Sequence, residues 1–188
     1  MWNSTRRSGT LFKEEGKLMT DIIKKRRSIR SYKNKEVAEE KIYDLLEAAM
    51  LAPSAGNEQP WHFIILDDKE IINEIPKIHP YSQMITQVNK AILVCADVNN
   101  TKYEGFWVQD CAAATENILL KAVDLGLGAV WLGIYPDEDR VAKFKSFFEL
   151  PANIIPVSLI PVGYPDVNKE TPDRLDENRI HRNKWEKS

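Results

Sequence analysis

The chain has 188 residues, of which 43% are hydrophobic, and its formal net charge at pH 7 is -2. A domain of this length buries about 70% of the surface of its unfolded chain, which is enough for a substantial core. The balanced charge excludes a basic field that would attract nucleic acid, and no apolar run reaches the ~20 residues that a membrane-spanning helix needs. We expect neither a nucleic-acid partner nor a membrane anchor.

The N-terminus and the cysteines give two further expectations. Residues 1–18 are rich in polar and charged side chains and show little periodicity, so we expect a poorly ordered extension followed by one domain over 19–188. They also lack the apolar stretch of a secretion signal. Cys95 and Cys111 lie in apolar surroundings without CxxC spacing, which predicts buried free thiols and a reducing cytoplasm.

In the first half of the chain, the hydrophobic pattern predicts helices that alternate with strands. Asp21 is placed to cap a short helix over 21–25, and a loop over 28–36 follows. The clearest early helix is 38–52, which Pro53 ends and whose apolar stripe consists of Ile42, Leu45, Leu46 and Ala49. The next segments are a strand over 61–66, short helices over 68–75 and 81–88, and a buried strand over 91–96.

The second half contains the longest predicted helix, over 106–125, whose small and apolar residues surround it on nearly all sides. Such a surface indicates burial against several neighbours or a subunit interface. A strand over 128–135, a helix that Asp137 caps and a last strand over 155–162 follow, before a polar tail over 165–188. Pro156 and Pro161 favour an edge or exchanged position for the last strand. Strands between helices predict a sheet covered by helices, of the α/β or α+β class.

Three segments stand out chemically: RRSIR at 26–30, APSAGNEQPW at 52–61 and GLGAVWLG at 126–133. The first offers guanidinium groups and a hydroxyl, which suit a phosphate, although a solvated basic helix end is an equally simple interpretation. The second is a polar turn before a strand, or a plain connection. The third has glycines that let backbone approach a flat group. Together they indicate a pocket for a planar, phosphorylated cofactor.

Other phosphate and catalytic motifs are absent from the sequence. The glycines near 126–133 do not form GxGxxG and precede a strand rather than a helix, and no GxxxxGK[ST] occurs. His62, His79 and His181 belong to no metal or hydrolytic motif. Side chains must therefore bind the phosphate, and a cofactor that brings its own chemistry is favoured.

The order and spacing of four motifs resemble the nitroreductase family of flavin mononucleotide (FMN) oxidoreductases over about residues 20–188. These motifs are RRSIRSY at 26–32, APSAGNEQPWHF at 52–63, AAATENILLKAVDLGLGAVWLGIYP at 112–136 and IPVGYP at 160–165. The resemblance implies an α+β, three-layer α/β/α fold with a mixed central sheet flanked by helices. It also implies a homodimer in which the C-terminal segments are exchanged and two flavin sites lie at the interface.

The resemblance assigns site residues in four groups. Basic residues and a hydroxyl would hold the phosphate and ribityl chain, with one further cation at the pyrimidine edge: Arg26, Arg27, Ser28, Arg30 and Arg174. The other subunit would supply a turn against the ring, consisting of Pro53, Ser54, Ala55 and Asn57. A strand end would lie on the opposite ring face and offer a backbone N–H to N5, through Trp131, Leu132 and Gly133.

The activity that the resemblance implies is two-electron reduction by a ping-pong mechanism. NAD(P)H would reduce the flavin, and a nitroaromatic, a quinone or a related electron-poor acceptor would then take its place, with Arg30 stabilising negative charge on the ring. Tyr103, Phe106 and Trp107 are either pocket residues or core aromatics. The alternatives are a flavin-binding sensor or carrier without turnover, a flavin-fragmenting or dehalogenating relative, and a DNA-binding module based on the charged cluster at 24–33.

Overall fold

The computed structural model describes residues 21–185, so the predicted extension over 1–18 lies outside the described residues. Within that part, five strands form one sheet in the order β1-β2-β5-β3, and β4 also pairs with β5. The strands are β1 (Trp61–Leu66), β2 (Lys90–Asp97), β3 (Gly128–Ala129), β4 (Leu132–Gly133) and β5 (Ile154–Gly163). All these ladders are antiparallel, and a parallel bridge between Ser28 and Ala129 gives the mixed character.

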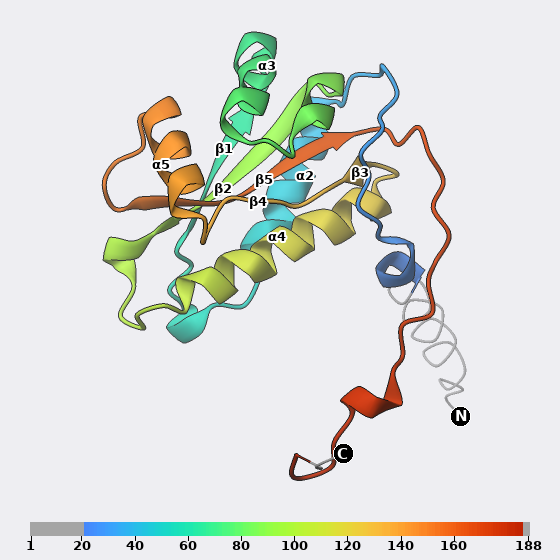
Figure 1. Cartoon of the computed structure of the whole chain (residues 1–188), viewed down its shortest axis with the longest axis vertical. Helices are drawn as coiled ribbons and strands as arrows, with labels where there is room; N and C mark the ends of the chain where they lie inside the picture. The colour runs from blue at the N-terminus through green and yellow to red at the C-terminus, as the bar shows by residue number, and fades with distance from the viewer. Residues whose placement is uncertain (1–20, 186–188) are drawn as a thin grey trace, which may run out of the picture.

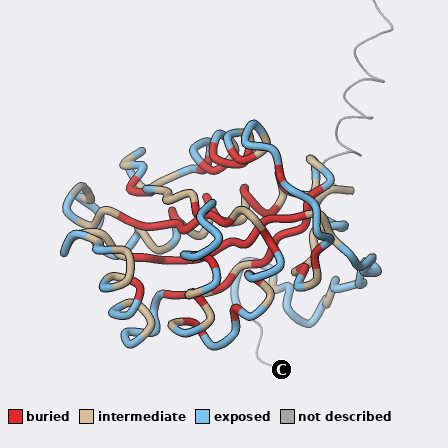
Figure 2. Tube along the Cα trace, turned by 90° about the horizontal axis from the view of Figure 1, so that it is seen from above, coloured by how far each residue is buried: buried red, intermediate tan, exposed pale blue. Residues whose placement is uncertain are grey.

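The sheet is the middle of three layers. Side chains of β2 alternate between two cores, because Ile92 and Val94 belong to the core under one helical layer and Leu93 and Cys95 to the core under the other. Figure 2 shows buried positions running along the strands, with exposed turns around them. The expected three-layer α/β/α arrangement is confirmed.

The first layer consists of α2 (Glu39–Met50) and α4 (Trp107–Asp124), which lie against one face of the sheet (Figure 1). Helix α2 buries the predicted stripe of Ile42, Leu45, Leu46 and Ala49, and its helical structure ends before Pro53. Helix α4 buries small side chains against both α2 and the strands, which its nearly all-round apolar surface predicts. Its Thr115 also forms a buried hydrogen bond of 2.9 Å with Ser158 of β5.

The second layer consists of α3 (Lys69–Ile78) and α5 (Glu138–Phe147), with the 3-10 turn η2 (Gln83–Gln87) where a helix over 81–88 was expected. Asp68 and Asp137 accept hydrogen bonds from backbone N–H groups in the first turns of α3 and α5, so the predicted cap at Asp137 is confirmed. Helix α3 continues past Pro76, which lies in its last turn and has no N–H to donate to the preceding turn.

The prediction of an edge or exchanged position for the last strand is wrong within the described protomer. Strand β5 is central, with β2 on one side and β3 and β4 on the other. Its prolines fall where pairing is interrupted: Pro156 lies beside a register shift against β2, and Pro161 lies between the short ladders to β3 and β4. A proline that lacks N–H is tolerated where no ladder bond is required.

The single strand expected over 128–135 is likewise divided into β3 and β4. Beside β3 lies the segment that follows the helical residues 21–25, where Ile29 N–H donates to the Ala129 carbonyl at 3.0 Å. The chain can approach this closely because Gly128 has no side chain: a Cβ there would lie 2.9 Å from Ile29 Cγ1. Gly128 therefore brings the arginine segment to the sheet.

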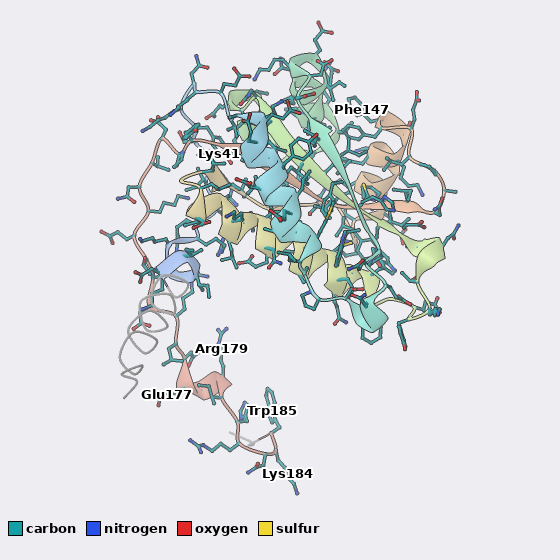
Figure 3. The ribbon with its side chains drawn as sticks, turned by 180° about the vertical axis from the view of Figure 1, so that it is seen from behind. Lys41, Phe147, Glu177, Arg179, Lys184 and Trp185 are labelled. Carbon is teal, nitrogen blue, oxygen red and sulfur yellow. The ribbon has the colours of Figure 1, made fainter. Side chains whose placement is uncertain are left out.

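After β5, the C-terminal segment runs past residues 21–25 and extends away from the body (Figures 1 and 3). Short 3-10 turn η4 (Glu177–Arg179) lies on this extension, as do the labelled Lys184 and Trp185 in Figure 3. None of the described helices is long and apolar enough to cross a membrane.

Candidate cofactor site

A basic hollow of about 300 Å³ lies between the arginine segment, α4 and the C-terminal segment. It contains four cationic side chains and one carboxylate, and its lining consists of Ile23, Lys24, Arg26, Arg27, Glu116, Thr171, Pro172 and Arg174. Arg26 and Arg174, which are far apart in the sequence, thus lie in one site. Guanidinium groups from two segments are suited to a phosphate, because they present paired donors.

Two hydrogen bonds attach the C-terminal segment at this place. Thr171 Oγ1 donates to the Lys24 carbonyl at 3.2 Å, and Lys169 Nζ donates to the Ser28 carbonyl at 2.7 Å. Both acceptors are backbone atoms of the segment that carries Arg26 and Arg27. The same contacts therefore bring Arg174 to the hollow.

The guanidinium of Arg27 contains a buried donor that no described residue satisfies. Within residues 21–185, its buried Nε has no hydrogen-bond partner. A buried charged donor without an acceptor costs more free energy than an ordinary unmade hydrogen bond, so such a group is favoured where an anion binds. Arg26 differs, because its Nε lies 3.3 Å from Glu116 Oε1. Burial raises the pKa of Glu116, and the charge of Arg26 partly opposes that rise.

The next predicted residues follow the arginines on the same segment. Ser28 is half-buried and bridges to Ala129, which puts it between the hollow and strand β3. Arg30 is exposed. The loop that carries both is fixed by Tyr32, whose hydroxyl donates to the Ile29 carbonyl at 2.7 Å and whose N–H donates to Gln87 Oε1 at 3.0 Å. Burial also raises the pKa of Tyr32, so this hydroxyl keeps its proton.

The predicted turn with Pro53, Ser54, Ala55 and Asn57 lies at the opposite end of α4 from the helical residues 21–25 (Figure 1). Ala55 N–H donates to Asp110 Oδ1 at 3.1 Å in the first turn of α4, whereas Arg26 pairs with Glu116, about 9 Å farther along the helix axis. The turn is a 3-10 helix, η1 (Ala55–Asn57), in which Asn57 has a φ of 57°. One protomer therefore does not bring this turn to the hollow.

Trp131, Leu132 and Gly133 form the third predicted group. Trp131 is half-buried, Leu132 is buried, and Gly133 leaves open space, since a Cβ built there meets no atom within 4 Å. Two donors fix the Gly133 carbonyl: His79 Nε2 at 3.1 Å and Arg140 Nη1 at 2.6 Å.

Nδ1 of His79 accepts from the Tyr81 N–H at 3.3 Å, so the ring is held in its neutral form. Burial accordingly lowers the pKa of His79, the Gly133 carbonyl opposes that change, and the Arg140 charge adds to it. The backbone at Gly133 is therefore held rigidly beside open space.

The sequence profile of the Nitroreductase family matches residues 23–104 and 81–164. The chain belongs to the nitroreductase family. Its fold is accordingly a nitroreductase fold, and its reaction class is that of an oxidoreductase.

Individual nitroreductase relatives are similar over most of their length. A Methanothermobacter thermautotrophicus protein named "Putative NADH dehydrogenase/NAD(P)H nitroreductase" is 52% identical over 165 residues, or 88% of this chain and 86% of the relative. The crystal structure of a "Putative NADH Oxidase" from Clostridium acetobutylicum has a TM-score of 0.85 at 50% identity, covering 88% of this chain and 100% of that one. An FMN-dependent nitroreductase from Clostridium difficile R20291 has a TM-score of 0.80 at 31% identity, covering 87% and 98%.

Several residues of the candidate site and its surroundings were not found from the sequence. Glu116 belongs to a helix that was predicted only as a buried small-residue surface, although its charge among alanines was a usable signal. His79 was set aside because no metal motif contained it, and Arg140 lay in an ordinary amphipathic helix. Asp110 holds the 55–57 turn, and its Oδ2 is buried with no hydrogen-bond partner in the described part of the chain.

Proposed function

We propose that this nitroreductase binds FMN and uses NAD(P)H to reduce nitroaromatic, quinone or related electron-poor acceptors by two electrons. The observation that carries the proposal is the basic hollow of Arg26, Arg27 and Arg174, with the buried Nε of Arg27 unpartnered among residues 21–185. The names of two relatives add support, since they specify NAD(P)H for one and FMN for the other.

The residues present fit the phosphate of FMN. Arg26, Arg27 and Arg174 would bind it through charge-assisted hydrogen bonds, each contributing about 1.5–3 kcal/mol. Ser28, next on the segment, would bind the ribityl chain. Since Arg27 Nε is already buried, this side chain loses less conformational entropy when a phosphate binds.

The ring of FMN would lie against the backbone of Trp131, Leu132 and Gly133, where Gly133 leaves open space. His79 and Arg140 both donate to the Gly133 carbonyl and so restrain this backbone. Arg30 would stabilise negative charge at the pyrimidine edge. FMN, when bound, supplies the acceptance of a hydride from NAD(P)H and its transfer to the acceptor.

The proposed enzyme is a homodimer that exchanges its C-terminal segments. Two observations support this. The turn of Pro53, Ser54, Ala55 and Asn57 lies away from the hollow of its own protomer, so a neighbouring copy would have to supply it. The C-terminal segment extends from the body with large apolar side chains in solvent: Leu175 is 78% exposed, Ile180 57% and Trp185 81%. A second copy would cover them.

The test is an absorbance spectrum of the purified protein, together with its mass in solution and its oxidation of NADH and NADPH with a nitroaromatic or a quinone. A yellow dimer that turns over supports the proposal. A yellow dimer without turnover would favour the carrier or sensor alternative, and a colourless monomer that does not bind added FMN would overturn it. We place the enzyme in the reducing cytoplasm, because the two described cysteines are free and buried.

A further inference from the structure

One residue of the basic hollow carries a charge that opposes the binding of an anion. Glu116, from the middle of α4, is the only carboxylate among the described residues that line it, facing Lys24, Arg26, Arg27 and Arg174. A negative charge in an anion site repels the ligand and occupies a donor that the ligand needs. Such a residue requires an explanation that phosphate binding alone does not give.

The ion pair shows what Glu116 does to Arg26. Its Oε1 lies 3.3 Å from Arg26 Nε, which is the inner nitrogen of the guanidinium, so the two terminal nitrogens are left for another acceptor. Both side chains are partly in solvent, at 26% for Arg26 and 45% for Glu116. The pair is thus accessible to a ligand and is not part of the buried core.

We infer that Glu116 is a positioning residue with two effects in the hollow. Its carboxylate orients Arg26 through Nε, and its negative charge weakens the binding of phosphate. This inference rests on the proposed function, because it takes the phosphate of FMN as the ligand. The two effects are separable, since glutamine keeps an oxygen that Nε can donate to and removes only the charge. Alanine removes both.

The expected magnitude follows from one unit charge a few ångströms from the phosphate at a partly exposed site. Removing it in Glu116→Gln lowers the Kd for FMN by about 3- to 10-fold. Riboflavin has the same ring without a phosphate, so its Kd stays unchanged. Glu116→Ala gains less affinity for FMN than Glu116→Gln, because Arg26 loses its orienting acceptor.

The pH dependence gives a second readout on the wild-type protein. The groups that face Glu116 from the 21–27 segment and from the C-terminal segment are all cations: Lys24, Arg26, Arg27 and Arg174. As the pH falls and Glu116 takes up a proton, the wild-type Kd for FMN approaches that of Glu116→Gln. Burial moves this convergence above the pH expected for an exposed glutamate. The free phosphate titrates identically in both experiments, so its own protonation cancels in the ratio of the two Kd values, and this ratio reports the coupling between Glu116 and the bound phosphate.

The experiment is fluorescence titration of the apoprotein with FMN and riboflavin, between pH 5 and 8, for the wild type, Glu116→Gln and Glu116→Ala. Asp124→Asn is the matched control, because it removes one charge from the same helix at an ion pair with Lys121, outside the hollow. It should leave both Kd values unchanged.

Equal FMN Kd values for wild type and Glu116→Gln at pH 8, or equal shifts for FMN and riboflavin, would overturn the inference while the proposed function stands. Failure of every variant and the wild type to bind FMN would overturn both. If Glu116→Gln does not fold, the wild-type protein alone tests the inference through the ratio of its Kd for FMN to its Kd for riboflavin. A ratio whose pH dependence is fully explained by titration of the free phosphate would refute the inference.

Discussion

Replacing Gly128 with alanine tests how the arginine segment is held against the sheet. A Cβ at this position would lie 2.9 Å from both Cγ1 and Cγ2 of Ile29 and 3.0 Å from its Cβ. The Cβ of Ile29 is attached directly to the backbone, so rotation of the side chain does not remove the overlap. The segment itself must move away from β3, weakening the hydrogen bond from Ile29 N–H to the Ala129 carbonyl.

The magnitude follows from overpacking a buried contact. Ile29 is only 7% exposed, and an extra methyl group in such a place costs about 1–3 kcal/mol of unfolding free energy. Without the contact, alanine in place of glycine is neutral or stabilises by about 0.4–1 kcal/mol, because it restricts the unfolded chain. The sign of the change therefore depends on Ile29.

The assay is urea unfolding of the apoprotein, followed by circular dichroism, in a double-mutant cycle with Ile29→Ala. Gly128→Ala should cost about 1–3 kcal/mol in the wild-type background and clearly less in the Ile29→Ala background, where Cγ1 and Cγ2 are gone and only the 3.0 Å approach to the Cβ remains. Two additive substitutions, with the same cost in both backgrounds, would refute the claim that Ile29 contact is the constraint.

Three further predictions concern the site. Gly133→Ala should change the unfolding free energy of the apoprotein by no more than about 0.5 kcal/mol, because a Cβ built there meets no atom within 4 Å. It should weaken FMN binding at least threefold, and an unchanged Kd for FMN in titration would contradict the ring placement. Arg26→Ala should weaken FMN retention by about 1.5–3 kcal/mol, and dialysed protein that stays fully yellow would disprove it. The pKa of His79 is lower in the folded protein than in the unfolded chain, so the unfolded chain takes up the proton first as the pH falls. The unfolding free energy should therefore decrease as the pH drops below about 6.5. His79→Gln should show a smaller fall in urea unfolding between pH 8 and 5, and an identical fall would exclude His79 as its source.

Periodicity was enough to predict the elements that carry the core. The stripe of α2 and the small-residue surface of α4 correspond to buried residues, because α2 packs on α4 and α4 is enclosed by α2 and the strands. Strand β2 is buried on both faces, which its uninterrupted apolar run indicates. In each case the local sequence and the tertiary contact agree.

Strand β5 shows where such local reasoning fails. Pro156 and Pro161 argue for an edge because each lacks an N–H, but that argument assumes continuous pairing on both sides. The pairing is interrupted beside Pro156 by a register shift against β2 and at Pro161 by the gap between β3 and β4, and both interruptions depend on segments far away in the chain. A rule applied to one strand cannot detect a gap in its neighbour.

The candidate site was predictable as a set of residue types and only partly as a place. The clustered arginines indicated an anion, and the structure brings Arg26, Arg27 and Arg174 into one hollow. The place of Glu116 does not follow from the sequence, and the separation of the 53–57 turn from that hollow was implied only by the family resemblance. Both depend on which residues of α4 face which neighbour, and hydrophobic periodicity does not report that.

The attachment of the C-terminal segment has a consequence for the order of events during synthesis. One wall of the basic hollow, with Arg174, follows β5 in the chain and is anchored through Lys169 and Thr171 to backbone atoms near the beginning of the described fold. The ribosome must therefore release nearly the whole polypeptide before that wall exists. Cleavage by a protease after residue 165 would leave every strand of the sheet intact and still remove this wall. The sheet could therefore stay folded after the protein had lost its ability to retain an anion.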